Sequence, residues 1–197
     1  MNFYLLDQPG DLDIAAYASA TDQVTTTIVC EICKRNWIRQ VKSLNIELYG
    51  LDIDGFVWTS GAQLVVTDRL MKNLLDAGIC GFSPRLVSFS YISKGRGGPN
   101  LLNTSQDFDA PLLHQLEIFT NNSEIPPSLT DLSVCPTCHQ YDFVRRRSSN
   151  FVIEFAKWNN TDVFTYRYAN LIITQRFLDL LQQSSIHNYK VSPLRTC

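Results

Sequence analysis

Two cysteine pairs carry the clearest chemistry in this chain. The first pair is Cys30 and Cys33, and the second pair, Cys135 and Cys138, has the same spacing. A C-x-x-C turn brings two sulfur atoms together, and two such pairs complete the four-thiolate shell of a structural zinc site. The spacing therefore predicts one tetrahedral zinc ion that is held by all four cysteines and stabilises the fold.

Two other interpretations of the cysteines stay open. The segment Cys135-Pro-Thr-Cys138 contains the proline often found in thioredoxin-like motifs, so either pair could act as a redox dithiol. The four residues could also be inert thiols left behind by a lost metal site. Of the other two cysteines, Cys80 lies in an apolar turn and is expected to be a buried structural thiol, whereas Cys197 is expected to be exposed.

Other chemically suggestive residues match known sites less well. The three histidines, His114, His139 and His187, have no metal-ligand spacing, which argues against a histidine-rich catalytic zinc. The segment Asp52-Ile-Asp54-Gly55 lacks the downstream glutamate of a calcium loop and is expected to be a turn. Residues 95–98 lack the Lys-Ser/Thr of a phosphate loop. Since no nucleophile or paired-carboxylate signature stands out, we expect a protein that is not an enzyme.

The strongest hint of nucleic-acid binding is the run Arg145, Arg146 and Arg147, with Tyr141 and Phe143 close by. Guanidinium groups beside aromatic rings can contact phosphate and stack on bases. The whole chain, however, has 17 Lys and Arg against 19 Asp and Glu, whereas general nucleic-acid binders carry a strongly basic face. A zinc-stabilised nucleic-acid-binding or regulatory module is therefore kept as the alternative function.

The composition predicts a soluble cytoplasmic protein. Hydrophobic residues make up 45% of the 197 residues, which is enough for a core. The first ten residues lack the basic region of a signal peptide. No segment approaches the run of about 18 apolar residues that a membrane-spanning helix needs. In the cytoplasm, paired cysteines are more often metal ligands or redox centres than lasting disulfides.

The positions of the cysteine pairs form part of an internal repeat. The second pair follows the first at an offset of 105 residues. The segment from Asp54 to Trp58 resembles Asp162 to Tyr166 at an offset of 108, and Leu64 to Ile79 resembles Leu171 to Ile186 at 107. Because these landmarks keep their order, we predict an internal duplication. The competing explanation is that strand-then-helix units look alike in any protein that combines the two.

Each half is expected to position its cysteines with similar elements. The β-branched run from Val24 to Val29 predicts a strand that leads into the first pair, and Leu44 to Tyr49 alternates as a strand should. Thr67 and Thr174 are the expected N-caps of two short amphipathic helices. Gly78 is placed to end the first of them.

These elements predict an α+β fold, with two duplicated lobes of mostly antiparallel sheet and short helices, bridged by a four-cysteine zinc site. Further strands are expected over residues 85–92, 112–119 and 151–155. Residues 1–95 would form the first lobe and residues 128–197 the second, with one cysteine knuckle in each. Residues 96–127 would supply a linker and a connecting strand.

The sequence resembles a known family, the double-CXXCG motif proteins. These are myxobacterial paralogues that are regarded as immunity proteins of polymorphic toxin systems. The resemblance rests on the two cysteine pairs, on Asp162-Val-Phe164, and on Ile172-Ile-Thr174-Gln-Arg176-Phe177, which is similar to the family's hydrophobic-Thr/Ser-x-Arg-Phe pattern. It spans most of the chain, although Lys34 and His139 stand where the family has glycine. It implies a bacterial, non-enzymatic protein that binds and neutralises a cognate protein toxin, with structural zinc.

Overall fold

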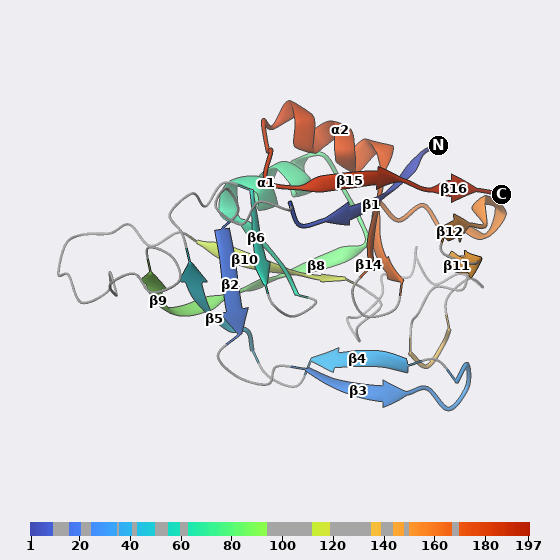
Figure 1. Cartoon of the computed structure of the whole chain (residues 1–197), viewed down its shortest axis with the longest axis horizontal. Helices are drawn as coiled ribbons and strands as arrows, with labels where there is room; N and C mark the ends of the chain where they lie inside the picture. Colours follow the sequence, from blue (N-terminus) through green and yellow to red (C-terminus); the bar gives the residue numbers. More distant parts are fainter. Residues whose placement is uncertain are drawn as a thin grey trace.

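The computed structural model is rich in β-strands and contains two short α-helices (Figure 1). The description below covers residues 1–9, 16–20, 25–34, 36–40, 43–49, 55–59, 63–93, 112–118, 135–138, 144–147, 150–166 and 170–197. No helix within these segments is long and apolar enough to cross a bilayer.

Four sheets organise the described strands, and most neighbouring strands are antiparallel. The largest sheet has the order β8-β10-β7-β6-β2-β5-β9, with strands Phe82–Leu86, Leu113–Ile118, Leu64–Thr67, Phe56–Thr59, Ala16–Ala20, Asn45–Tyr49 and Ser88–Ser93. The second has the order β13-β14-β1-β15, with strands Val163–Tyr166, Asn170–Thr174, Phe3–Asp7 and Lys190–Pro193. The small sheets are β11-β12-β16 (Val144–Arg147, Asn150–Ile153, Arg195–Thr196) and β3-β4 (Thr25–Val29, Asn36–Gln40). The predicted mixture of short helices and mainly antiparallel sheet is confirmed.

Two sets of elements have the same strand order. We call β6, β7, α1 (Asp68–Asp76), β8 and β10 the first unit, and β13, β14, α2 (Gln175–Gln183), β15 and β1 the second unit. The order is β8-β10-β7-β6 in the first unit and β15-β1-β14-β13 in the second. The registers agree as well, since Phe56 pairs with Val66 as Val163 pairs with Ile173.

The strand at the start of the chain belongs to the second unit. Phe3 of β1 lies opposite Thr174, just as Leu113 of β10 lies opposite Thr67. Strand β1 is therefore flanked by β14 and β15, from the other end of the sequence, and β10 is flanked by β7 and β8. The two strands hold equivalent places in opposite units.

The strand pairing corrects one of the sequence alignments by one residue. Comparison of the segments at Asp54 and Asp162 gave an offset of 108, but Phe56 matches Val163 in the sheets, at an offset of 107. The backbone explains this match, because Thr67 N donates to the Gly55 carbonyl and Thr174 N donates to the Asp162 carbonyl, both at 2.9 Å.

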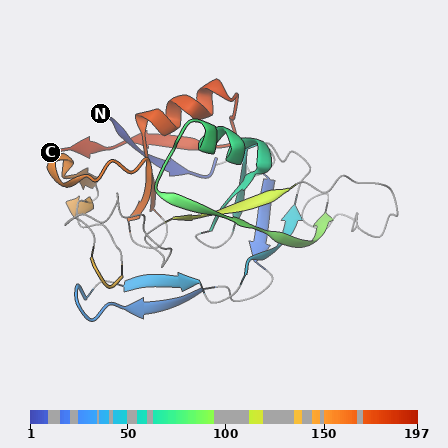
Figure 2. The same cartoon turned by 180° about the vertical axis from the view of Figure 1, so that it is seen from behind.

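Both helices begin at the predicted threonines. The hydroxyl oxygen of Thr67 accepts from Leu70 N, and that of Thr174 accepts from Phe177 N, each at 3.4 Å. Gly78 follows α1 with φ of +63°, the left-handed conformation that commonly ends a helix. The helices lie beside each other on the same side of the sheets in both views (Figures 1 and 2), and Asn73 Nδ2 donates to Ser184 Oγ at 2.9 Å.

One hydrophobic core serves both units. It contains buried residues of both helices and of the strands beneath them, among them Leu6, Phe56, Leu70, Leu74, Leu116, Val163, Ile173, Phe177 and Leu181. A smaller cluster of Phe3, Ile153, Phe164 and Ile172 lies on the other face of β1 and β14. Because burial of apolar area is the main favourable term in folding, this shared core joins the units directly.

Some boundaries differ from the prediction. Residues 85–92 form parts of two strands, because Val87 N donates to the Leu113 carbonyl whereas Ser88 N donates to the Leu44 carbonyl, where β9 joins β5. Strand β12 ends at Ile153, and a short 3-10 helix, Phe155–Lys157, follows. The lobe boundaries after residues 95 and 127 fall outside the described segments.

Candidate metal centre

The four cysteines come from two short turns. Cys30 follows β3, and the turn to Cys33 leads into β4. Lys34 closes this turn, since its N donates to the Cys30 carbonyl at 2.9 Å and its φ is +59°. Glycine adopts that backbone conformation with least strain, so Lys34 occupies a position where the family's glycine would fit. Cys135 and Cys138 flank the second turn.

The structure brings all four sulfur atoms into one cluster, as the spacing predicts. Their Sγ atoms all lie within 4.8 Å of one another. Cys30 Sγ is 3.9 Å from Cys135 Sγ, and Cys33 Sγ is 3.4 Å from Cys138 Sγ. Four thiolates at about 2.3 Å from a tetrahedral zinc ion would lie about 3.8 Å apart. The cluster therefore has the dimensions of a four-thiolate metal site.

The environment of the cluster suits metal binding. Cys30 and Cys138 are buried, whereas Cys33 and Cys135 are partly exposed. The backbone N–H of Cys33, with a smaller contribution from that of Ile32, lowers the pKa of the Cys30 thiol to about 7, although burial acts in the opposite direction. All six cysteines lie in described segments, and none of them forms a disulfide. Four soft thiolates favour zinc over hard cations such as magnesium.

The other residues considered from the sequence lie elsewhere. Cys80, which was expected to be buried, is only half-buried, whereas Cys197 is exposed, as expected. Burial raises the pKa of the Cys80 thiol, which makes it a poor nucleophile. His187 is exposed. The three arginines at positions 145–147 lie on β11, opposite residues 150–152 of β12. Other positions fall outside the described segments: Asp52, Asp54, residues 95–98, His139, Tyr141 and Phe143.

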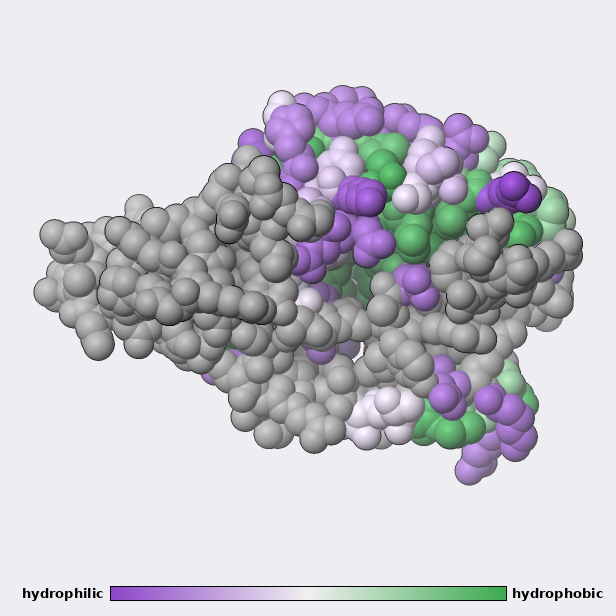
Figure 3. Space-filling view, in the orientation of Figure 1, coloured by the Kyte–Doolittle hydropathy of each residue, from purple (hydrophilic) through white to green (hydrophobic). Residues whose placement is uncertain are grey.

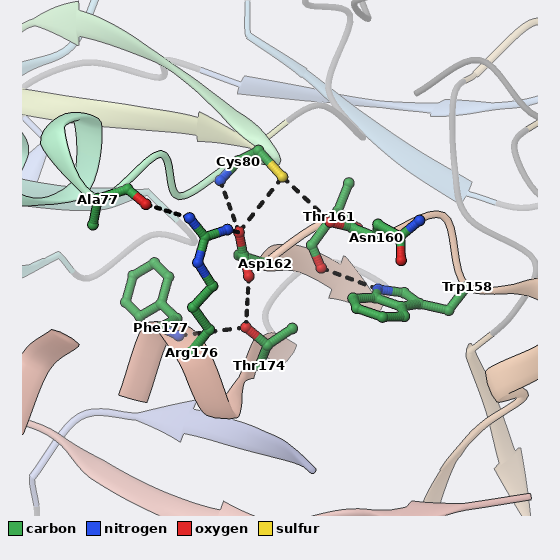
Figure 4. Close-up of polar contacts among 9 residues, drawn as sticks. All are labelled: Ala77, Cys80, Trp158, Asn160, Thr161, Asp162, Thr174, Arg176 and Phe177. Atoms are coloured by element: carbon green, nitrogen blue, oxygen red, sulfur yellow. Dashed lines mark hydrogen bonds and ion pairs between the residues drawn. The ribbon is translucent and has the colours of Figure 1, made fainter. Parts of the chain in front are cut away.

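A buried polar network around Asp162 was not predicted from the sequence (Figure 4). Asp162 is 2% exposed, and its carboxylate accepts from Thr174 Oγ1 at 2.8 Å and from Cys80 N at 3.1 Å. Arg176 Nη1 forms an ion pair with it at 3.1 Å, and Arg176 Nη2 donates to the Ala77 carbonyl. The network thus links the end of α1 to β13 and α2. The available signal was that Asp162, Thr174 and Arg176 all lie in the segments that resemble the double-CXXCG proteins.

A second polar cluster lies where β10 meets the start of α1. Asp68 contacts Lys72 at 2.7 Å and His114 at 3.0 Å. The hydrogen bond from Lys72, followed by the one from His114, lowers the pKa of the Asp68 carboxyl. At the equivalent place in the second unit, Tyr4 Oη donates to Gln175 Oε1. The first contact holds β10 to the first turn of α1, and the second holds β1 to the first turn of α2.

No protein-family model matches the chain, and the search of curated proteins returned no match. The resemblance to the double-CXXCG proteins therefore stays a prediction from the residues that carry it.

Proposed function

We propose that Cys30, Cys33, Cys135 and Cys138 hold one structural zinc ion. The observation that carries this proposal is the convergence of four sulfur atoms from two distant turns, all within 4.8 Å. Four protein ligands would complete the tetrahedral shell and leave no position for a substrate, which favours a structural role over a catalytic one. The zinc would join the turn after β3 to the turn at residues 135–138.

Elemental analysis of the purified protein tests the metal. We expect one zinc per chain in the native protein, loss of zinc in Cys33→Ser, and retention of zinc in the matched variant Cys197→Ser. If the native protein instead holds no metal and its four thiols cycle between dithiol and disulfide at a defined potential, the redox interpretation replaces the zinc site.

We infer further that the two units descend from one duplicated unit whose first strands have been exchanged. The support is the constant offset of 107 residues in the paired registers, together with equivalent threonine caps. Strand β1 precedes the first unit in sequence but pairs within the second unit. Strand β10 precedes β13, β14 and α2 of the second unit but pairs within the first unit. The cysteine pair of the first half of the sequence then lies beside the pair of the second half in the four-sulfur cluster.

We propose that the protein neutralises a cognate bacterial toxin by binding it. This rests on the resemblance to the double-CXXCG immunity proteins. The residues that carry the resemblance have structural roles in this protein. Thr174 caps α2, Arg176 pairs with Asp162, and Phe177 is buried in the core. The pattern therefore supports a shared fold, and the toxin-binding surface would lie on other residues.

Growth rescue tests the immunity role. If a large gene lies immediately upstream of this one, its product is the candidate toxin, to be expressed in a host with and without the present protein. Immunity predicts that co-expression restores growth and that the two proteins co-purify. Failure to protect against a toxin that kills the host would contradict the proposal, and the Cys197→Ser variant should protect as well as the native chain.

A further inference from the structure

The hairpin of β3 and β4 stands apart from the rest of the fold. Its strands pair antiparallel with each other, from Thr25 opposite Gln40 to Val29 opposite Asn36, and with no other strand among those described. In both views it lies below the two larger sheets (Figures 1 and 2). An isolated two-stranded hairpin is marginally stable in water, so this one needs an anchor.

The described apolar side chains at the turn end of the hairpin are largely exposed. Val29 is 59% exposed and Ile32 in the turn is 65% exposed. At this end of the hairpin the surface mixes apolar and hydrophilic residues (Figure 3). Ile28 is partly buried, and it packs against the cysteine cluster. Among the described side chains of the hairpin and its turn, Ile28, Cys30 and Cys33 pack into the cysteine cluster.

The core of the protein is separate from this cluster. Cys30 and Cys138 form their own buried group with Ile28, Cys33 and Cys135, and none of these residues belongs to the core shared by the two units. The shared core and the exchanged strands already hold the units together. Loss of the metal would therefore remove an anchor of the hairpin while the main sheets keep theirs.

We propose that metal binding at the four cysteines acts as a clasp that docks the β3–β4 hairpin onto the turn at residues 135–138. The proposal rests on the metal site proposed above. With the metal bound, sulfur–metal bonds hold the two turns together. Without it, no sulfur–metal bonds join the two turns, and the hairpin separates while β1, β7, β10 and β14 stay folded. Metal supply would then control which surface this end of the molecule presents.

Hydrogen–deuterium exchange of the full chain, read by mass spectrometry, tests the clasp. The samples are the zinc-loaded protein, the same protein after chelation, and the chelated protein with zinc added back. Binding stabilises the docked state by the factor 1 + [Zn²⁺]/Kd, so at free zinc 100 times Kd we expect amides of residues 25–40 to exchange about 100-fold more slowly than after chelation. Amides of β1, β7, β10 and β14 should change little.

A variant outside the hairpin separates the clasp from local damage. Cys135→Ser removes a ligand from the opposite turn, and we expect it to release residues 25–40 as chelation does. Cys197→Ser, which alters an exposed cysteine, should leave the pattern unchanged. Loss of protection throughout the protein on chelation would overturn the clasp, and so would a hairpin whose exchange does not respond to zinc. If elemental analysis finds no metal, the proposed metal site itself fails, which is a distinguishable result.

Discussion

Replacement of Asp162 tests how much the buried polar network around this residue stabilises the fold. Its carboxylate is 2% exposed and accepts from Cys80 N, Thr174 Oγ1 and Arg176 Nη1. Asp162→Ala would leave a backbone N–H and a hydroxyl without an acceptor and would remove the partner of a guanidinium. Removing one member of a buried ion pair costs about 3–5 kcal/mol. Because the Arg176 side chain is 50% exposed and can reach water, we expect the lower half of that range.

The isosteric variant separates charge from shape. Asp162→Asn keeps one acceptor oxygen but loses the negative charge, so we expect a loss of about 1.5–3 kcal/mol, the worth of a hydrogen bond to a charged group. For a chain of this size each kcal/mol lowers Tm by about 2–4 °C. Urea unfolding followed by circular dichroism gives the free energies, and thermal melting gives the Tm.

The partner residue supplies the control. Arg176→Met leaves Cys80 N and Thr174 Oγ1 with their acceptor but leaves the buried Asp162 carboxylate without its counter-ion, so we expect a cost comparable with that of Asp162→Ala. The double variant should cost less than the sum of the two single variants, since the residues share one interaction. The reasoning would be refuted if Asp162→Ala lost less than about 1 kcal/mol, which is the average effect of any substitution.

Two further predictions concern backbone strain and pH. Gly81 has φ of +112°, and a Cβ there would collide with the Val163 carbonyl, so Gly81→Ala should cost more in urea unfolding than Gly78→Ala, where Arg176 Nη2 lies 3.3 Å away and can shift. Asp68 has a lowered pKa, so its contribution to stability is present above its ordinary value of 3.8 and is lost as the pH falls through its lower folded value. Asp68→Asn should therefore weaken the acid dependence of unfolding in pH titrations.

Local signals in the sequence predicted the local structure well. Thr67 and Thr174 cap their helices because a hydroxyl can satisfy a free N–H of the first turn, whatever surrounds the helix. Gly78 adopts the left-handed conformation for an equally local reason. The cysteine spacing also predicted which four thiols would meet, since each pair forms half of a metal shell.

Pairings between distant strands could not be read from the sequence. A strand was predicted over residues 112–119, where β10 lies, but none was predicted at β1, and a local pattern carries no information about which neighbours a strand joins. The sheet that each of these strands joins depends on the shared core, into which Leu6 and Leu116 both pack. The Asp162 network was missed for the same reason, because Cys80 and Arg176 reach it only when the end of α1 meets β13.

The sequence by itself determined the helix starts, several of the strands and the composition of the sulfur cluster, because these depend on neighbours along the chain. The tertiary structure alone decided that β1 completes the second unit, that both units share one core, and that β3 and β4 form a sheet of their own. These features depend on which apolar surfaces bury one another, and that choice is made by the whole chain at once.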